Sequence, residues 1–356
     1  LGWSEEISAW LRINSAFLKG YSPEAVTIGL IAVFMILFQF FNDFVASVFA
    51  YLFNDVVPPQ FLSRFMGLFR IAGIVGSAVY NFFVFKYAES HMREIFTCAA
   101  VLYFFGFGMM CLKVKEREYP PLGEEEKKNS RGFAAIKSYF KESFSHRMYW
   151  IIFVGNAFSA IAAAMVCFNV FFQKEMGLSL DQIGKLAAVL AVAMLAATYF
   201  AAIFIDRWHP VRITAYAVAF SLIGIAMNWV WIFVKLPGDI YFWLCIGTNM
   251  TTAFYSALAA VAGTPRQMRL FPQSRYGQFC SAQAMLKWLC VIGGGATAGL
   301  FVDTIRRFCP SPDFAYRFNF VWSLIFTMFS VLFGILVYRE WLKLGGDKHY
   351  HPPAPW

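Results

Sequence analysis

PPQFLSRFMG at residues 58–67 and FPQSRYGQ at residues 271–278 look like two copies of one loop, about 210 residues apart. Each stretch stands between two long apolar segments, and each runs through Pro, Arg and Gly into a Gly-rich apolar stretch. The match is loose, because the spacing from Pro to Arg differs between the copies. A repeat of this length indicates an internally duplicated membrane protein, the architecture of many secondary transporters.

The composition supports a membrane protein. Hydrophobic residues make up 59% of the chain and charged residues 14%, whereas roughly 25% charged residues are usual in soluble proteins. Nine apolar segments approach the ~20 residues that a bilayer core requires, and they lack the polar alternation of barrel strands. We therefore predict an all-α polytopic membrane protein, with spanning helices near residues 26–53, 65–85, 95–112, 148–172, 186–205, 213–233, 241–263, 277–302 and 318–338.

The basic residues are distributed unevenly over the loops between these segments. One alternating set of loops holds 18 of the 30 Lys and Arg residues and the other set holds 10. The positive-inside rule places the richer set in the cytoplasm. We expect a multi-pass protein of the cell (inner) membrane, with residue 1 outside and a cytoplasmic C-terminus. The net charge of +9 follows from this bias, so the sequence gives no reason to expect a nucleic-acid partner.

The cysteines and histidines do not indicate a cofactor. None of the seven cysteines forms a CxxC pair, and most lie in or beside apolar segments. Neither a disulfide framework nor a metal or redox centre is favoured. We expect no cofactor beyond a coupling ion, H⁺ or Na⁺.

The start of the chain reads as an outer loop with an amphipathic piece near Ile7–Phe17, and it has no signal-peptide pattern. Nine helices fit a twofold repeat poorly, whereas three further helices before residue 1 would give twelve. We therefore expect a fragment that holds nine of twelve transmembrane helices.

Residues 113–147 form the one long, charged, Pro-containing connection. Its second half, Gly132–Ser145, has Phe and Ile at helical spacing with Lys between them. This pattern fits a helix on the inner membrane face or an ordinary soluble linker helix equally well. We predict a partial N-terminal bundle at 1–112, a cytoplasmic linker at 113–147, a six-helix bundle at 148–339 and a cytoplasmic tail at 340–356.

The loop after the second helix beyond this linker reads Asp206-Arg207-Trp208-His209-Pro210-Val211-Arg212. An Asp-Arg pair at a helix end, followed five residues later by Arg, resembles the signature loop of the major facilitator superfamily. It stands in the register of that family, although Ala201-Ala202 and Pro210 depart from its usual glycines. The resemblance implies the family's two-bundle fold, with the helices here equivalent to its fourth to twelfth.

The resemblance also implies alternating access. Charge-assisted contacts across the short inner loops can hold one face closed. We expect gating roles for Asp206, Arg207 and Arg212 and for the loop arginines Arg64 and Arg275. The alternative is that the positive charges of these loops only set the orientation of the protein in the membrane.

Ionisable groups inside spanning helices are costly and are functional candidates. Asp43 and Lys287 lie deep in their apolar segments. Asp43 is the predicted cation-coupling carboxylate. The resemblance places the helices at 26–53, 148–172 and 241–263 around a central cavity, so the predicted substrate-binding residues are Asn42, Asn156, Asn169, Asn249, Tyr255 and Lys287. Interhelical hydrogen bonding is the alternative role for each Asn.

Asn42-Asp43, and Asn54-Asp55-Val56-Val57-Pro58-Pro59 followed by Arg64, look similar to the sugar–cation (glycoside-pentoside-hexuronide-like) symporter branch of the superfamily. We therefore expect a monomeric, cation-coupled secondary transporter in the lipid bilayer, with a small-molecule substrate that is best guessed as a sugar. Two alternatives stay open: a membrane-embedded lipid-modifying enzyme, for which the five His show no HExxH or HxxxD spacing, and a non-transporting binding or scaffold protein.

Overall fold

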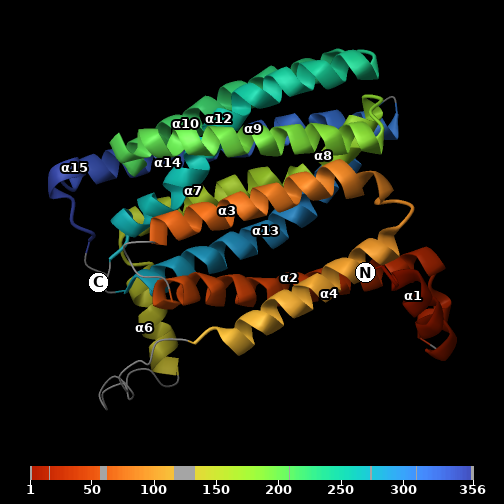
Figure 1. Cartoon of the computed structure of the whole chain (residues 1–356), viewed down its shortest axis with the longest axis horizontal. Coiled ribbons are helices and arrows are strands. Elements are labelled where there is room, and N and C mark those ends of the chain that lie inside the picture. Colours follow the sequence, from red (N-terminus) through yellow and green to blue (C-terminus); the bar gives the residue numbers. More distant parts are fainter. Residues whose placement is uncertain are drawn as a thin grey trace. The chain divides into compact units, whose positions relative to one another are not determined.

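The computed structural model of the chain describes residues 2–15, 17–56, 62–115, 133–207, 209–272, 275–309 and 311–353. Every regular element in these ranges is a helix (Figure 1). The chain divides into two compact units, one formed by Leu1–Gly76 and Phe83–Pro121 and the other by Ser77–Phe82 and Leu122–Trp356.

The first unit contains a short polar helix and long apolar ones. Its helices are α1 Ser4–Asn14, η1 Leu18–Gly20, α2 Pro23–Val56, α3 Leu62–Val79, η3 Phe85–Tyr87 and α4 Met92–Lys113. Helix α3 continues as a π-helical turn, Tyr80–Val84, and the residues Ser77–Phe82 at this junction are grouped with the second unit. The predicted amphipathic piece near Ile7–Phe17 corresponds to α1, which begins three residues earlier. Helix α1 packs on α2, where the Ser8 and Thr27 hydroxyls lie 2.7 Å apart, and Glu6 forms an ion pair with Arg93 of α4.

The second unit contains six long helical segments and several short elements. They are α6 Phe133–Ser143, α7 Arg147–Ala163, η4 Ala164–Phe168, α8 Asn169–Glu175, α9 Leu180–Arg207, α10 Pro210–Met227, α11 Val230–Phe233, α12 Gly238–Leu270, α13 Tyr276–Arg306, η6 Pro312–Phe318, α14 Asn319–Lys343 and α15 Gly346–His349. The helix predicted over Gly132–Ser145 is α6, and one of its sides packs on α13.

The long helices of the second unit pack in an order that differs from their order in the chain. Helix α9 packs on α12, α12 on α10, α10 on α14, α14 on α7, and α7 on α13. Glycines allow two of these close approaches: a Cβ on Gly155 of α7 would lie 3.0 Å from Phe333 of α14, and a Cβ on Gly294 of α13 would lie 3.3 Å from Ile161 of α7. Small residues at such crossings let helices pack by van der Waals contact, the main attraction available in lipid.

An aromatic core closes the end of the unit that contains the start of α7. The Tyr149 and Phe279 rings have centroids 4.3 Å apart, and Phe153, Phe271 and Trp341 are buried in the same cluster. The C-terminal segment is fastened to this end, because the Tyr149 hydroxyl donates a hydrogen bond to the Pro353 carbonyl at 2.7 Å. Outside such clusters many large apolar side chains are exposed, as expected for surfaces that lipid covers.

Nine helical spans within the described ranges are long and apolar enough to cross a membrane. They coincide with the nine predicted segments and confirm an all-α polytopic fold. One predicted boundary is wrong. We ended a helix at residue 263 and began a loop there, whereas α12 continues through Pro265 to Leu270. The predicted division into domains and the predicted further helices stay predictions.

Candidate functional site: the polar interior of the second unit

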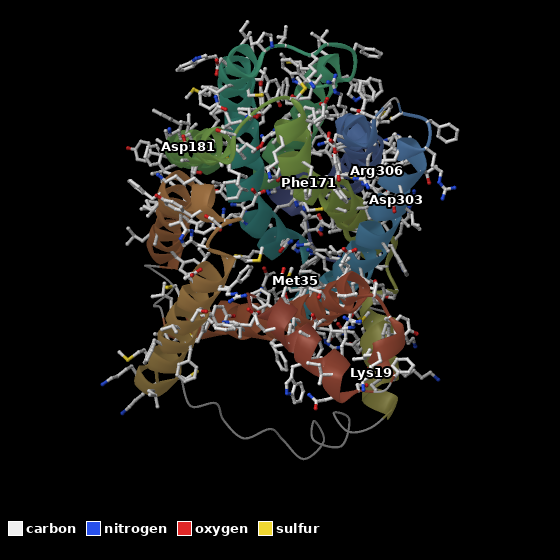
Figure 2. The ribbon with its side chains drawn as sticks, turned by 90° about the vertical axis from the view of Figure 1, so that its right-hand side faces the viewer. Lys19, Met35, Phe171, Asp181, Asp303 and Arg306 are labelled. Atoms are coloured by element: carbon white, nitrogen blue, oxygen red, sulfur yellow. The ribbon has the colours of Figure 1, made fainter. Side chains whose placement is uncertain are left out.

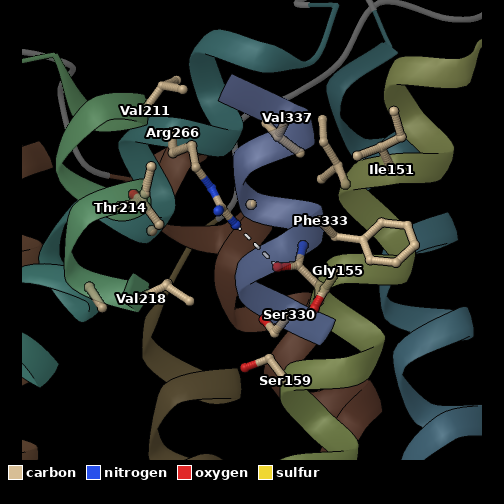
Figure 3. A pocket seen from close by; sticks show the side chains of 16 residues that line it. Ile151, Gly155, Ser159, Val211, Thr214, Val218, Arg266, Ser330, Phe333 and Val337 are labelled. Atoms are coloured by element: carbon tan, nitrogen blue, oxygen red, sulfur yellow. Dashed lines mark hydrogen bonds between the residues drawn. The ribbon is translucent and has the colours of Figure 1, made fainter. Parts of the chain in front are cut away.

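Four helices of the second unit enclose a cavity of about 180 Å³ (Figure 3). Its wall is mostly apolar, with Ile151, Val211, Val218 and Phe333 among the side chains. Arg266 is the one charged residue among the described side chains that line it. The full lining is Ile151, Ile152, Gly155, Asn156 and Ser159 of α7; Val211, Thr214, Ala215 and Val218 of α10; Ala259, Gly263 and Arg266 of α12; and Ser330, Phe333, Gly334 and Val337 of α14.

Arg266 crosses this cavity from α12 (Figure 3) and donates a hydrogen bond from Nη2 to Oδ1 of Asn156, at 3.1 Å. Two further donors are buried without a hydrogen-bond partner among the described residues, Nε of Arg266 and Nδ2 of Asn156. The neighbouring hydroxyls use their protons elsewhere: Thr214 donates to the Pro210 carbonyl and Ser330 to the Gly155 carbonyl. The cavity therefore contains a positive charge and unpartnered donors.

A second cavity of about 380 Å³ adjoins the first between the same helices. The two share Ser159, Val218, Ala259 and Ser330 in their walls. No charged side chain belongs to the described lining of the larger cavity, whose polar groups are amides and hydroxyls: Ser159, Asn169, Ser221, Asn228, Tyr255, Ser256, Asn319, Ser323, Thr327 and Ser330.

Two contacts organise this larger cavity. Asn319 donates from Nδ2 to Oδ1 of Asn169 at 2.6 Å, and the Tyr255 ring stacks on Phe220 with centroids 5.1 Å apart. Neutral amides, hydroxyls and an aromatic face together supply the donors and acceptors that a polar, uncharged solute needs.

A buried ion cluster lies at the end of the unit where α8 ends. Glu175 accepts hydrogen bonds from Nε and Nη2 of Arg317, both at 2.8 Å, and a third from Lys235 at 3.2 Å. Arg317 also donates to the Trp231 carbonyl at 3.1 Å. Figure 2 labels Phe171 and Arg306 at this end; Phe171 stacks on Tyr316, and Arg306 donates to the Tyr316 hydroxyl.

Two of the predicted gating residues form ion pairs at the opposite end. Arg212 of α10 contacts Asp347 of α15 at 2.7 Å, and Arg275 pairs with Glu142 at the end of α6. His209 caps α10 by accepting a hydrogen bond from the Val211 N–H at 3.3 Å, and its ring packs on Trp341. Burial lowers the pKa of His209, and the charges of Arg269 and Arg212 lower it further, against the opposing effect of Asp347.

The structure brings three of the predicted substrate-binding residues into adjoining cavities: Asn156 into the smaller, and Asn169 and Tyr255 into the larger. Neither cavity includes Asn249 of α12 or Lys287, whose ammonium lies 5.7 Å from the Trp288 ring centroid. In the first unit, Asn42 accepts a hydrogen bond from the Tyr103 hydroxyl at 3.3 Å. The side chains of Asp43, Arg64, Asp206 and Arg207 lie outside the described part of the chain.

Arg266 is not among the predicted site residues. The predicted helix ends at residue 263, whereas α12 continues through Pro265 to Leu270, although proline usually ends a helix. Helical spacing could have found it, since Ala259, Gly263 and Arg266 stand at positions i, i+4 and i+7 and therefore share one helix face. Asn228 and Asn319 were also missed, although they lie in the predicted segments 213–233 and 318–338.

Comparison with known proteins gives two results. The family model of the Major Facilitator Superfamily matches residues 13–295. Among solved structures, the chain is similar to the crystal structure of a bacterial homologue of the human lysosomal transporter Spinster, in an inward-facing and unoccupied conformation. The identity is 17%, the TM-score is 0.49, and the match covers 85% of this chain and 75% of that chain. No curated protein matches.

The family model spans most of the chain, including seven complete membrane-spanning segments of the described ranges and part of α13. Transport of small molecules through an integral, multi-pass membrane fold is the common property of that family. The chain belongs to the Major Facilitator Superfamily.

Proposed function

We propose that the protein is a cation-coupled secondary transporter that carries a sugar across the cell membrane by alternating access. The observation that supports a sugar is the larger cavity of the second unit, whose described lining is rich in amides and hydroxyls and contains no charged side chain. A sugar presents donors and acceptors on every face but no charge, so neutral hydrogen-bonding groups match it without a desolvated ion.

Thr327→Val tests this assignment. Valine has nearly the shape of threonine, so the substitution removes one cavity hydroxyl without opening a void. A lost hydrogen bond of about 1 kcal/mol weakens binding about fivefold. A thermal-shift screen of the protein with a panel of sugars identifies the ligand, and titration of the variant measures the loss. Thr304→Val is the matched control, because its exposed hydroxyl bonds the Leu300 carbonyl away from the cavity. Equal sugar affinity in Thr327→Val and Thr304→Val would show that the larger cavity is not the solute site.

Asp43 is the proposed coupling residue. Its position in an apolar helix raises the cost of its charge, which favours uptake of a proton or association with Na⁺. Asp43→Asn should abolish gradient-driven accumulation in proteoliposomes while sugar exchange continues. Glu24→Gln, in the exposed first turn of the same helix, is the control. Accumulation that survives Asp43→Asn would end the coupling assignment.

We propose that Asp206 and Arg207, with Arg64, Arg212 and Arg275, hold the inner face closed until the transporter changes conformation. The ion pairs of Arg212 and Arg275 support this role, because both join segments that flank inner loops in the predicted topology. Asp206→Asn should lower the transport rate much more than the sugar affinity. Lost binding with normal conformational exchange would contradict the gating role.

The proposed orientation places the loops rich in Lys and Arg, and the C-terminus, in the cytoplasm. Cys309, between α13 and η6, then faces outward. A membrane-impermeant maleimide should label Cys309 in intact cells at alkaline pH, since burial raises the pKa of this thiol. A cysteine introduced by His351→Cys should react only after lysis. The reverse pattern would invert the topology.

A further inference from the structure

Arg266 carries a positive charge inside the second unit that an uncharged sugar would not neutralise. Among the described residues its guanidinium forms no ion pair with a carboxylate, and its hydrogen-bond partner there is the neutral amide of Asn156. Buried charges in proteins are normally paired, because an isolated ion loses its hydration without compensation. A membrane-spanning helix makes that cost larger.

The two unpartnered donors belong to the two side chains that the hydrogen bond from Arg266 to Asn156 joins. Nε of Arg266 and Nδ2 of Asn156 have essentially no solvent access and no acceptor among the described residues, and both side chains line the 180 Å³ cavity. Since the guanidinium has no acceptor atom, the charged group of this cavity can only donate. A ligand that satisfies it must accept hydrogen bonds and carry negative charge.

We propose that Arg266 and Asn156 form a binding site for a compact monovalent anion, a halide or a carboxylate group, inside the second unit. One negative charge matches the one positive charge, so a divalent sulfate or phosphate dianion would leave an excess charge in the cavity. The apolar wall formed by Ile151, Val211 and Phe333 strengthens the attraction by lowering the local dielectric constant.

The position of the site gives the anion a structural effect. Arg266 belongs to α12 and Asn156 to α7, two helices that the packing order separates by α10 and α14. An anion between them would neutralise the guanidinium and join the two sides of the bundle. This inference does not depend on the solute being a sugar or on Asp43 coupling its transport.

Thermal unfolding of the purified protein in detergent tests the site. Sodium chloride, bromide and formate are titrated at constant ionic strength, with the bulky sulfonate 2-(N-morpholino)ethanesulfonate replacing them. A compact anion that binds the folded state raises Tm in a saturable way. A response to both halides but not to formate identifies a halide site, whereas a response to formate alone identifies a carboxylate site. The absence of a saturable response to any of the three would overturn the proposal.

Two variants and a matched control connect the response to the site. Arg266→Gln should remove the saturable rise entirely, whereas Arg269→Gln, which removes an exposed charge three residues away on the same helix, should keep it. Asn156→Asp should place a carboxylate within reach of the Arg266 guanidinium. That variant should melt at a higher temperature than the wild type without added anion, and it should no longer respond to anions.

Asn156→Asp also decides the outcome if Arg266→Gln does not fold. An anion response that persists at wild-type size in Asn156→Asp would contradict the proposal, as would its persistence in Arg266→Gln.

Discussion

At the scale of single residues, Glu175 and Arg317 form the most enclosed ion pair in the described part of the chain. Their side chains are 8% and 4% exposed. The bidentate contact and the bond from Arg317 to the Trp231 carbonyl join η6 and α11 to the end of α8. Removing one partner of a pair this buried destabilises the fold, because the other charge is then left buried without a counter-charge.

Glu175→Gln should destabilise the second unit by about 3–5 kcal/mol, because it leaves the Arg317 charge buried without a counter-charge. The measurement is the free energy of unfolding in detergent. Asp239→Asn is the control: Asp239 accepts an exposed hydrogen bond from Gln182, and surface contacts of this kind contribute about 0–1 kcal/mol. The double variant Glu175→Leu with Arg317→Met should recover much of the loss. A double variant less stable than Glu175→Gln would show that the ion pair itself stabilises the fold.

His209 predicts a dependence of stability on pH. Its folded-state pKa is lowered, so the folded protein favours the neutral ring, whose Nδ1 accepts from Val211. This contribution is fully present above the unfolded pKa of about 6.5 and is lost as the pH falls through the folded pKa.

The test compares Tm at neutral and mildly acidic pH. His209→Asn keeps an N-cap acceptor but does not titrate, so it should lose less Tm on acidification than the wild type. Parallel curves for the two proteins would show that His209 does not contribute to the acid sensitivity.

At the scale of elements, polar contacts at one end of α6 hold this helix to the rest of the second unit. Glu142 pairs with Arg275 and accepts from Gln278 at 3.1 Å, and the Tyr139 hydroxyl lies 2.9 Å from the Ser281 hydroxyl of α13. The arginine of the second Pro-Arg-Gly loop therefore contacts the helix that follows the central linker.

Glu142→Gln should loosen α6. Because Arg275 is 40% exposed, the expected effect is at most about 1 kcal/mol, or roughly a fivefold increase in the open population. Trypsin cleavage after Lys137 and Lys141 should accelerate by the same factor. Glu340→Gln, which removes a local pair with Lys343 at the end of α14, should leave that rate unchanged. An unchanged cleavage rate in Glu142→Gln would show that the apolar contacts of α6 are sufficient to hold the helix in place.

The sequence predicts the helices better than it predicts the contacts between them. Long apolar segments predict the nine spans found in the described ranges, because bilayer thickness sets helix length. The end of α12 is predicted too early. Pro265 lies inside this helix, although a proline ring disfavours a helix interior. Asn156 and Asn169 were found as polar residues in apolar segments, but their partners Arg266 and Asn319 come from distant segments. Such pairings depend on how helices pack, which no local pattern contains.

At the scale of the whole molecule, family membership and the nine apolar spans found in the described ranges indicate an integral membrane transporter. The adjoining cavities place the polar groups of the second unit between α7, α10, α12 and α14. The proposed sugar site and the proposed anion site would then be neighbours that share four wall residues. Binding of an anion at Arg266 is therefore expected to change sugar affinity as well as Tm.

A transporter must carry its bound solute across the membrane, and counterflow in proteoliposomes measures this movement. Vesicles containing the protein are loaded with the unlabelled sugar that stabilises it most in the thermal-shift screen, and then diluted into a trace of the same sugar in labelled form. Alternating access predicts a transient accumulation of label inside the vesicles that protein-free liposomes do not show. A sugar that binds the protein saturably but never exchanges across the membrane would contradict the account and identify a binding or scaffold protein instead.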